Sequence, residues 1–297
     1  MAAELRMSTP EPRPVYWSVQ RELWENRSVY IAPIVVASFV MFGFLLSLIT
    51  LPHRMQIALA MDAAKQRATV SMPFTFIAGF TMLTAFVVGV FYCLDALHGE
   101  RRDRSILFWK SLPVSDRVAV LSKASIPLVV LPVYIFTIIV GAQLIMLMLS
   151  TVVLMGSTQS VAILWTHVKF FQGIIAMLYA LIAIALWHAP IYGWLLLVSA
   201  WAKRATFLWA FLPFFAISIL ERMAFNSTHF AKFVQYRLIG WFAQAFNAPT
   251  HGSPPVDPLA AITLGKFLST PGLWIGLIFA AAFIAATVRL RRNREPI

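Results

Sequence analysis

Long apolar stretches alternate with short charged ones along the whole chain. Crossing a hydrocarbon core takes about 20 apolar residues in a helix. Stretches that contain no Asp, Glu, Lys or Arg lie at 28–52, 68–94, 124–168, 170–202, 205–220 and 267–288. Lipid offers the backbone no hydrogen bonds, and these stretches lack the alternation of a β-barrel strand. The pattern therefore predicts an all-α, polytopic membrane protein.

The number of spans depends on the stretch 170–202, which holds Pro190 in its interior. It fits one long kinked helix or two short ones. A seventh span would move the basic tail 289–294 to the outside, against the excess of Lys and Arg that marks cytoplasmic loops. We therefore expect a single transmembrane domain over 1–297, with six spans at about 29–51, 72–94, 124–154, 168–200, 205–222 and 268–288.

Composition and charge agree with this topology. The chain is 60% hydrophobic with a net charge of +12, and its mean hydropathy is +0.78. No soluble fold hides that much apolar surface. Six spans put both termini and most of the 24 Lys and Arg residues in the cytoplasm. Bases spread over loops that face anionic lipid indicate membrane lipid as their partner and no nucleic acid.

The remaining segments are few. Residues 1–28 read as a cytoplasmic tail followed by an interfacial helix, because Tyr16, Val19, Leu23 and Trp24 recur at helical spacing opposite Arg21, Glu22 and Glu25. A plain lead-in to the first span is the alternative. The largest outward segment is 223–267, which is expected to be helical near 229–246 and irregular at the Pro-rich 248–258.

The chain carries none of the common catalytic or nucleotide-binding motifs. It has no phosphate-binding loop, no H-E-x-x-H and no G-x-S-x-G. Cys93 is the only cysteine, and the six His residues are scattered without metal-ligand spacing. We expect no catalytic, cofactor or metal site and no enzymatic activity. Gln143 and His188 lie within the spans, where interhelical hydrogen bonding is a better explanation than substrate contact.

One charged segment stands out, at 95–116 between the second and third spans. Six residues of 100–110 are charged, and Phe108 and Trp109 lie among them. Residues 95–112 read as a helix in which Glu100 and Arg104 pair at i, i+4, Pro113 ends it, and Ser115 caps the next helix. An interface belt with positive-inside charges explains Trp109 and some Arg, but not the acids. The segment 95–118 is therefore predicted to be a docking elbow.

The elbow resembles a motif of bacterial type-2 ABC transporter (ABC-2) permeases. Those subunits carry a Tyr-x-x-Asp-x-Leu, then a Glu-Arg-x-Asp-x-Ser, then a Lys-Ser-Leu-Pro-Val-Ser pattern at this place. The matching stretch, 91–123, covers about a tenth of the chain. Its matching residues are Tyr92, Asp95, Leu97, Glu100, Arg101, Asp103, Ser105, Lys110, Ser111, Leu112, Pro113, Val114 and Ser115.

The resemblance implies an exporter of the bacterial cytoplasmic (inner) membrane. The permease would pair with a second permease copy and with a separate cytoplasmic ABC ATPase, which would hold ATP and Mg. The expected ATPase-coupling interface comprises Asp95, Glu100, Arg101, Arg102, Asp103, Arg104, Phe108, Trp109, Leu112 and Pro113. Two alternatives stay open, a non-transporting membrane scaffold and a self-contained secondary transporter. The substrate is open too; apolar spans suit a lipid-like, peptide or hydrophobic cargo.

Overall fold

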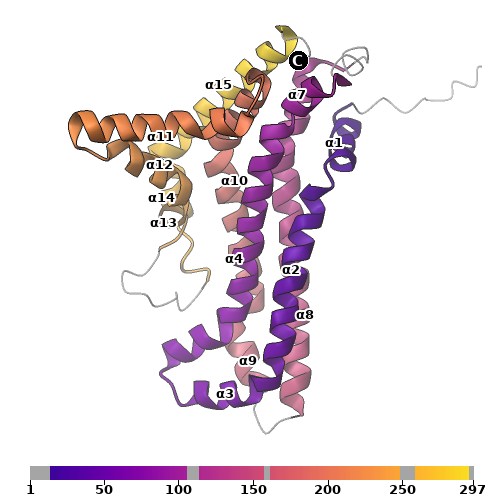
Figure 1. Ribbon diagram of the computed structural model, residues 1–297. Helices are drawn as coiled ribbons and strands as arrows, with labels where there is room; N and C mark the ends of the chain where they lie inside the picture. Colours follow the sequence, from indigo (N-terminus) through magenta and orange to yellow (C-terminus); the bar gives the residue numbers. More distant parts are fainter. Residues whose placement is uncertain (1–13, 106–113, 157–160, 248–257, 294–297) are drawn as a thin grey trace, which may run out of the picture.

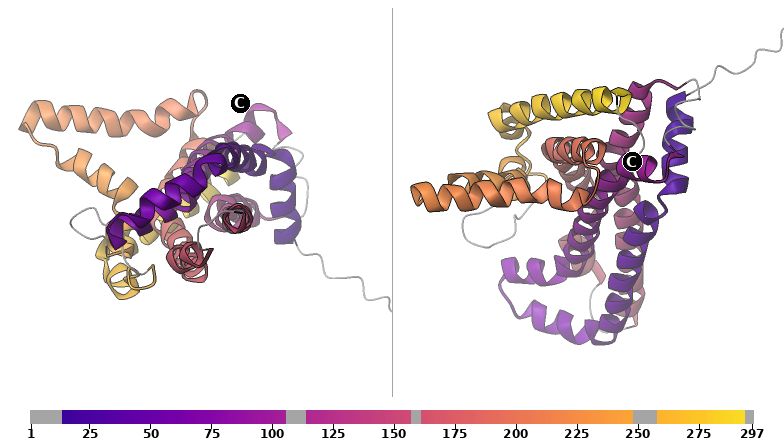
Figure 2. Two further views of the ribbon diagram at one scale, coloured as in Figure 1. Left: turned by 90° about the horizontal axis from the view of Figure 1, so that it is seen from below. Right: turned by 45° about the horizontal axis from the view of Figure 1, so that its top comes forward.

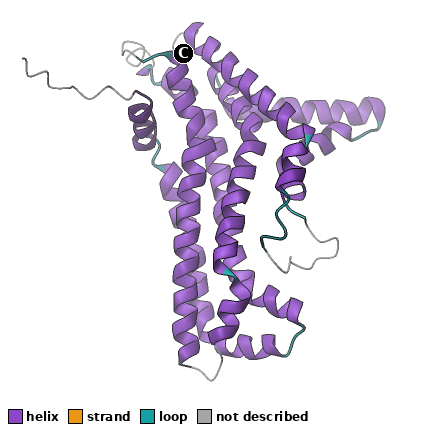
Figure 3. Ribbon diagram, turned by 180° about the vertical axis from the view of Figure 1, so that it is seen from behind, coloured by secondary structure: helices purple, strands orange, loops and turns teal. Residues whose placement is uncertain are grey.

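The computed structural model describes residues 14–105, 114–156, 161–247 and 258–293. In these ranges the chain is helical, apart from turns and one isolated antiparallel bridge between Phe246 and Ile262 (Figure 3). Six helical stretches are long and apolar enough to cross a membrane, as predicted. They are Ser28–Ala58, Lys65–Arg102, Asp116–Met155, Leu164–Trp201, Thr206–Phe225 and Pro271–Asn293.

Four long helices run side by side along one axis: α2 (Ser28–Ser47), α4 (Ala63–Asp95), α8 (Leu131–Met155) and α10 (Phe170–Trp201) (Figure 1). Helix α10 continues through Pro190 without a break, so 170–202 is one helix rather than two. The core between these helices is apolar and includes Leu131, Ile135 and Leu196. At one end lie the short helices α3 (Leu51–Leu59) and α9 (Val161–Val168).

The opposite end of the bundle carries α1 (Pro14–Glu25), α5 (His98–Arg102), α7 (Asp116–Ser125) and the C-terminal end of α15 (Pro271–Asn293) (Figure 1). Helix α7 begins where the sequence predicts, since Ser115 Oγ accepts a hydrogen bond from Val118 N at 3.3 Å. A π-helical turn, Ile126–Val130, joins α7 to α8. It contains Pro127, which has no N–H for a regular helical bond.

Helix α11 (Thr206–Phe225) is oriented differently from the four long helices. It lies across their axis and extends away from them (Figures 1 and 2). Ala210 is its one buried residue, while Phe215, Ile219 and Met223 are exposed. Length and composition therefore identified α11 as a potential span, whereas its direction comes from the turn that precedes it.

The segment 223–267 packs against the flank of α10. The predicted helix at 229–246 is divided into α12 (His229–Ile239) and α13 (Trp241–Ala245). A short α14 (Leu264–Ser269) follows residues 248–257, which lie outside the described ranges. Trp187 Nε1 donates to Arg237 O at 2.9 Å, so α10 supplies a donor to the end of α12.

Gln143 and His188 within the spans bond between helices, as predicted. Gln143 Nε2 of α8 donates to Phe74 O of α4 at 2.9 Å. His188 Nε2 of α10 lies 3.0 Å from Leu238 O of α12, an oxygen that can only accept. Each bond satisfies a buried polar group that lipid would leave without a partner.

Gly193 sets the approach of α15 to α10. A Cβ at this position would lie 3.3 Å from both Ala280 O and Phe283 Cβ. Gly193→Leu is therefore expected to lower the free energy of unfolding by about 1–3 kcal/mol through overpacking. Gly173→Leu on the same helix is the control, because a Cβ there meets nothing within 4 Å. Thermal unfolding in detergent compares the two; equal effects would refute the packing argument.

Candidate functional site

The charged elbow is not the single helix predicted for 95–112. Helix α4 ends at Asp95, α5 spans only five residues, and Arg104 has a left-handed backbone with φ of 56°. Arg104 thus lies past the end of α5, and the predicted i, i+4 geometry of Glu100 and Arg104 does not arise. Residues 106–113 lie outside the described ranges, and with them the predicted anchors Phe108, Trp109, Leu112 and Pro113.

The break between α4 and α5 is stabilised by a side chain of α10. Ser199 Oγ accepts hydrogen bonds from Leu97 N at 3.1 Å and His98 N at 2.9 Å. Its hydroxyl replaces the carbonyls that a continuous helix would have offered to these two donors. Ser199 is fully buried, so water is no substitute.

Glu100 of α5 points into the protein, where it meets three cations. Its Oε1 lies 3.1 Å from Arg21 Nη2 and 3.1 Å from Lys123 Nζ, and its Oε2 lies 3.3 Å from Arg291 Nη2. These partners come from α1, α7 and α15. One carboxylate therefore joins the elbow to the helices at both ends of the chain.

Glu22 of α1 is the second carboxylate of this cluster and is fully buried. Lys123 Nζ donates to both of its oxygens at 2.9 Å, and Tyr92 OH donates to Oε2 at 2.9 Å. Arg21 bonds it as well. Sequence patterning had assigned Glu22 to the polar outer side of an interfacial helix. That placement is wrong, because Val19 and Leu23 pack on the core beside Glu22, whereas Trp17 and Trp24 are exposed.

Arg291 of α15 completes the cluster. Its Nη1 donates at 3.0 Å to Oδ1 of Asp116, which is the first residue of α7. Its Nη2 donates to Oε2 of Glu100 at 3.3 Å. We call the six residues Arg21, Glu22, Glu100, Asp116, Lys123 and Arg291 the ion cluster. It contains three carboxylates and three cations, so it is balanced in formal charge. Removing one partner from such a cluster leaves a buried charge uncompensated.

Arg101, next to Glu100, is buried and bonds to a different element. Its Nη1 donates to Ala200 O at 2.9 Å and to Ala202 O at 3.2 Å. Helix α10 ends at Trp201, so these carbonyls lie at its C-terminus, where a cation is stabilised.

The outward side of the elbow carries the other predicted site residues. Asp95, Arg102 and Asp103 expose 58–62% of their side chains, and Arg104 is exposed too. Arg102 Nε lies 3.0 Å from Asp103 Oδ1 and its Nη1 lies 3.9 Å from Asp95 Oδ1. Exposed pairs like these contribute little to stability. We call Asp95, Arg102, Asp103 and Arg104 the charged rim.

Sequence reasoning thus singled out the charged segment 95–116 but not its internal partners. Of ten expected contact residues, Glu100 and Arg101 face inward, four form the rim, and four lie outside the described ranges. Glu22, Lys123, Arg291 and Ser199 were missed. A usable signal was present for Lys123, a lone lysine directly before the uncharged stretch 124–168. No local signal marks Ser199.

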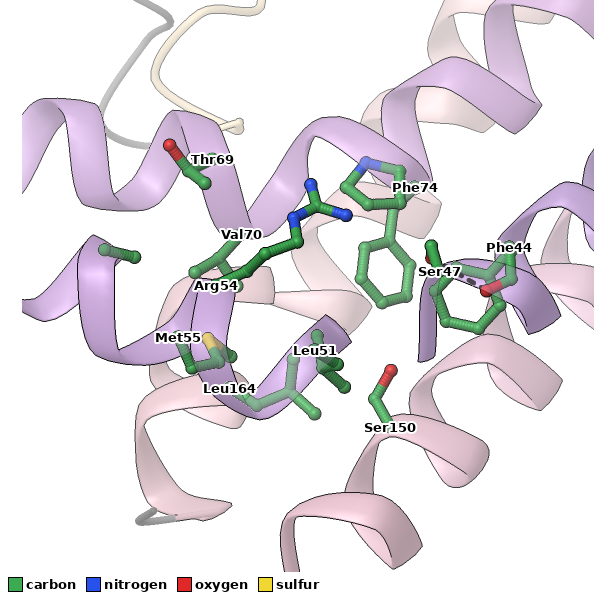
Figure 4. Close-up of a pocket in the computed structure, with 12 residues that line it drawn as sticks. Phe44, Ser47, Leu51, Arg54, Met55, Thr69, Val70, Phe74, Ser150 and Leu164 are labelled. Carbon is green, nitrogen blue, oxygen red and sulfur yellow. Dashed lines mark hydrogen bonds between the residues drawn. The ribbon is translucent and has the colours of Figure 1, made fainter. Parts of the chain in front are cut away.

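A small cavity lies at the opposite end of the bundle from the ion cluster. Its walls come from α2, α3, α4, α8 and α9, including Phe44, Arg54 and Phe74 (Figure 4). The cavity measures about 30 Å³, which is room for about one water molecule. No group of three or more His, Cys, Asp or Glu with metal-binding geometry occurs among the described residues. The ion cluster and rim are therefore the candidate site.

Comparisons of the chain with protein-family models, with curated proteins and with solved structures found no match.

The ion cluster predicts how stability depends on pH. Burial alone would raise the pKa of the Glu22 carboxyl, but Lys123 and Arg21 outweigh it and hold this pKa below its usual range. A carboxyl with a lowered folded-state pKa stabilises the fold at every pH above its unfolded value, about 4.3, and loses this contribution as the pH falls further.

We therefore expect the unfolding temperature to be level between about pH 6 and 8 and to fall below about pH 4.3. Glu22→Gln is expected to reduce this fall of the unfolding temperature at acid pH. Glu25→Gln, one turn away and half exposed, serves as the control. Thermal unfolding over a pH series measures both. A fall at acid pH that is unchanged in Glu22→Gln would contradict the assignment.

Proposed function

We propose that the chain is the membrane-spanning subunit of an ATP-binding cassette exporter, driven by a separate ATPase that binds the charged rim. The observation that carries this proposal is the two-sided elbow. Its outer side presents four exposed charged residues, while Glu100 and Arg101 on its inner side bond to α1, α7, α10 and α15. A coupling element must be both accessible to its partner and stiffly attached to the spans that it moves.

Two further features support the proposal. The described residues contain six candidate spans, and the sequence has no nucleotide-binding motif, so the energy for transport would come from ATP and Mg held by the partner. At the elbow's end of the bundle, exposed bases occur at Arg27, Arg117, Lys203, Arg204, Arg289 and Arg292. An excess of bases favours the cytoplasmic side for this end.

On this proposal α1 lies in the cytoplasmic headgroup layer. Its exposed Tyr16, Trp17 and Trp24 suit the boundary between lipid and water. The working unit contains two copies of the chain and two ATPase subunits, and it resides in a bacterial cytoplasmic membrane. The cargo is not specified by any feature of the described residues.

The direct test is co-expression with ABC ATPase subunits from the same organism. The exporter proposal expects a complex that survives size-exclusion chromatography and that changes conformation when ATP is added. If the chain binds no ABC ATPase, the proposal is wrong. A complex that forms without any nucleotide-dependent movement or transport would favour the scaffold. Substrate movement by the chain alone, driven by an ion gradient, would favour the secondary transporter.

A further inference from the structure

The elbow is bonded to the last turn of α10 as well as to its own two spans. Several hydrogen bonds make this attachment. Ser199 Oγ accepts from Leu97 N and His98 N, Arg101 Nη1 donates to Ala200 O and Ala202 O, and His98 Nδ1 lies 3.3 Å from Ala202 O. Two of them hold α5 by its backbone, so α5 cannot shift relative to α10 without leaving buried donors unpaired. By this geometry α5 and the end of α10 move together.

The end of α10 leads directly into a bent connection. Only residues 202–205 separate α10 from α11, and Ala205 has a left-handed backbone with φ of 51°. An alanine is rarely found in this conformation unless its surroundings impose it. The groups that bond the elbow, Ser199 Oγ, Ala200 O and Ala202 O, thus all lie within three residues of this strained connection or inside it.

Helix α11 is held at both ends. Near its C-terminus, Glu221 accepts hydrogen bonds from Ser227 Oγ at 2.6 Å and from His229 N and Phe230 N, both at 2.8 Å, which bind it to the start of α12. Its first turns contact α10. Trp194 Nε1 of α10 donates to Ala210 O at 3.1 Å, and the rings of Trp201 and Trp209 lie 5.0 Å apart. Beyond Ala210, α11 has no buried residue and runs away from the four long helices (Figure 2). Elements with few buried contacts move most readily. A small rotation at the junction would therefore displace α11 together with the start of α12, to which Glu221 bonds it.

We infer that Arg101 and Ser199 are positioning residues that transmit a displacement of the elbow to the α10–α11 junction and so to α11. This inference rests on the proposed function and names the route of coupling within it. The sequence suggests only a route into the second and third spans, which flank the elbow. The contacts of Arg101 and Ser199 add a second route, through residues 202–205, into the fifth span, α11.

The first arm of the test uses the full chain alone in lipid nanodiscs and measures amide hydrogen exchange. Ser199→Ala is expected to speed exchange about tenfold both at residues 97–98 and at residues 202–206. Arg101→Gln should act similarly on 202–206, and Arg101→Lys less, since it keeps the charge. Ser122→Ala is the matched control, because this buried serine bonds within its own helix, to Ala119 O. Faster exchange at 97–98 with no change at 202–206 overturns the inference.

The second arm uses the complex with the ATPase and a nitroxide label at Phe215→Cys, an exposed site on α11. ATP is expected to change the label's mobility in the parent protein. In Ser199→Ala this change should fall at least about twofold while the complex still forms. If the change persists undiminished, the inference is wrong and the proposed function stands. If no complex forms with the parent protein, the proposed function fails, and the first arm alone decides whether elbow and junction are linked.

Discussion

Lys123→Met is expected to lower the free energy of unfolding by about 3–5 kcal/mol, because it removes one partner from a buried ion cluster. Lys123 exposes only 2% of its side chain and is the main cation for Glu22, whose two oxygens it contacts at 2.9 Å. Methionine has a similar volume, so packing changes little. The loss therefore reports the uncompensated carboxylate rather than a cavity.

The control for this prediction is Arg117→Met on the same helix. Arg117 is exposed, so its replacement should change stability by no more than about 0.5 kcal/mol. The double variant Lys123→Met with Glu22→Gln should recover part of the loss, because it removes the charge left unpaired. Thermal or denaturant unfolding in detergent measures all three variants. A Lys123→Met protein as stable as Arg117→Met would show that the cluster is not a stabilising element.

Reversing the two bases of the rim, with Arg102→Glu and Arg104→Glu together, is expected to weaken ATPase binding by about 100-fold. Like charges brought together at an interface cost several kcal/mol, and 1.4 kcal/mol corresponds to a tenfold change. Both side chains are exposed, and Arg102 bonds only to rim carboxylates in the contacts described. The fold itself should therefore be unaffected, with an unchanged unfolding temperature.

The matched control reverses two exposed bases elsewhere at the same end of the bundle, with Arg27→Glu and Arg289→Glu. These changes alter the net charge equally but lie off the elbow. Affinity is measured by titrating the ATPase onto the chain in nanodiscs at two salt concentrations, because rim charges affect mainly the salt-dependent part of association. Equal weakening in both double variants would indicate general electrostatic attraction and would remove the rim from the interface.

The two sides of the elbow thus predict opposite effects. Variants of the ion cluster should lose stability, whereas variants of the rim should lose binding while keeping stability. Glu100 and Arg102 are two residues apart in sequence but differ in exposure, at 6% and 59% of the side chain. Comparing Glu100→Gln with Arg102→Gln under one protocol would separate a structural from an interfacial role.

Much of the fold follows from the sequence. The lengths of the uncharged stretches are sufficient for six helices, and the start of α7 follows from Ser115, because a local cap depends only on neighbouring residues. The continuous α10 followed from the distribution of bases. The break of the elbow at 96–97 did not, because it is stabilised by Ser199, more than 100 residues away in the sequence. Helical spacing alone favoured one helix there.

The sequence by itself determined that this is a helical membrane protein whose one dense charged segment joins the second and third spans. Apolar length and charge distribution are properties of the chain order, so they can be read without coordinates. Only the tertiary structure decided which of those charges face the interior. Glu22, Glu100, Lys123 and Arg291 lie on four different helices, and they become partners only where the ends of those helices meet.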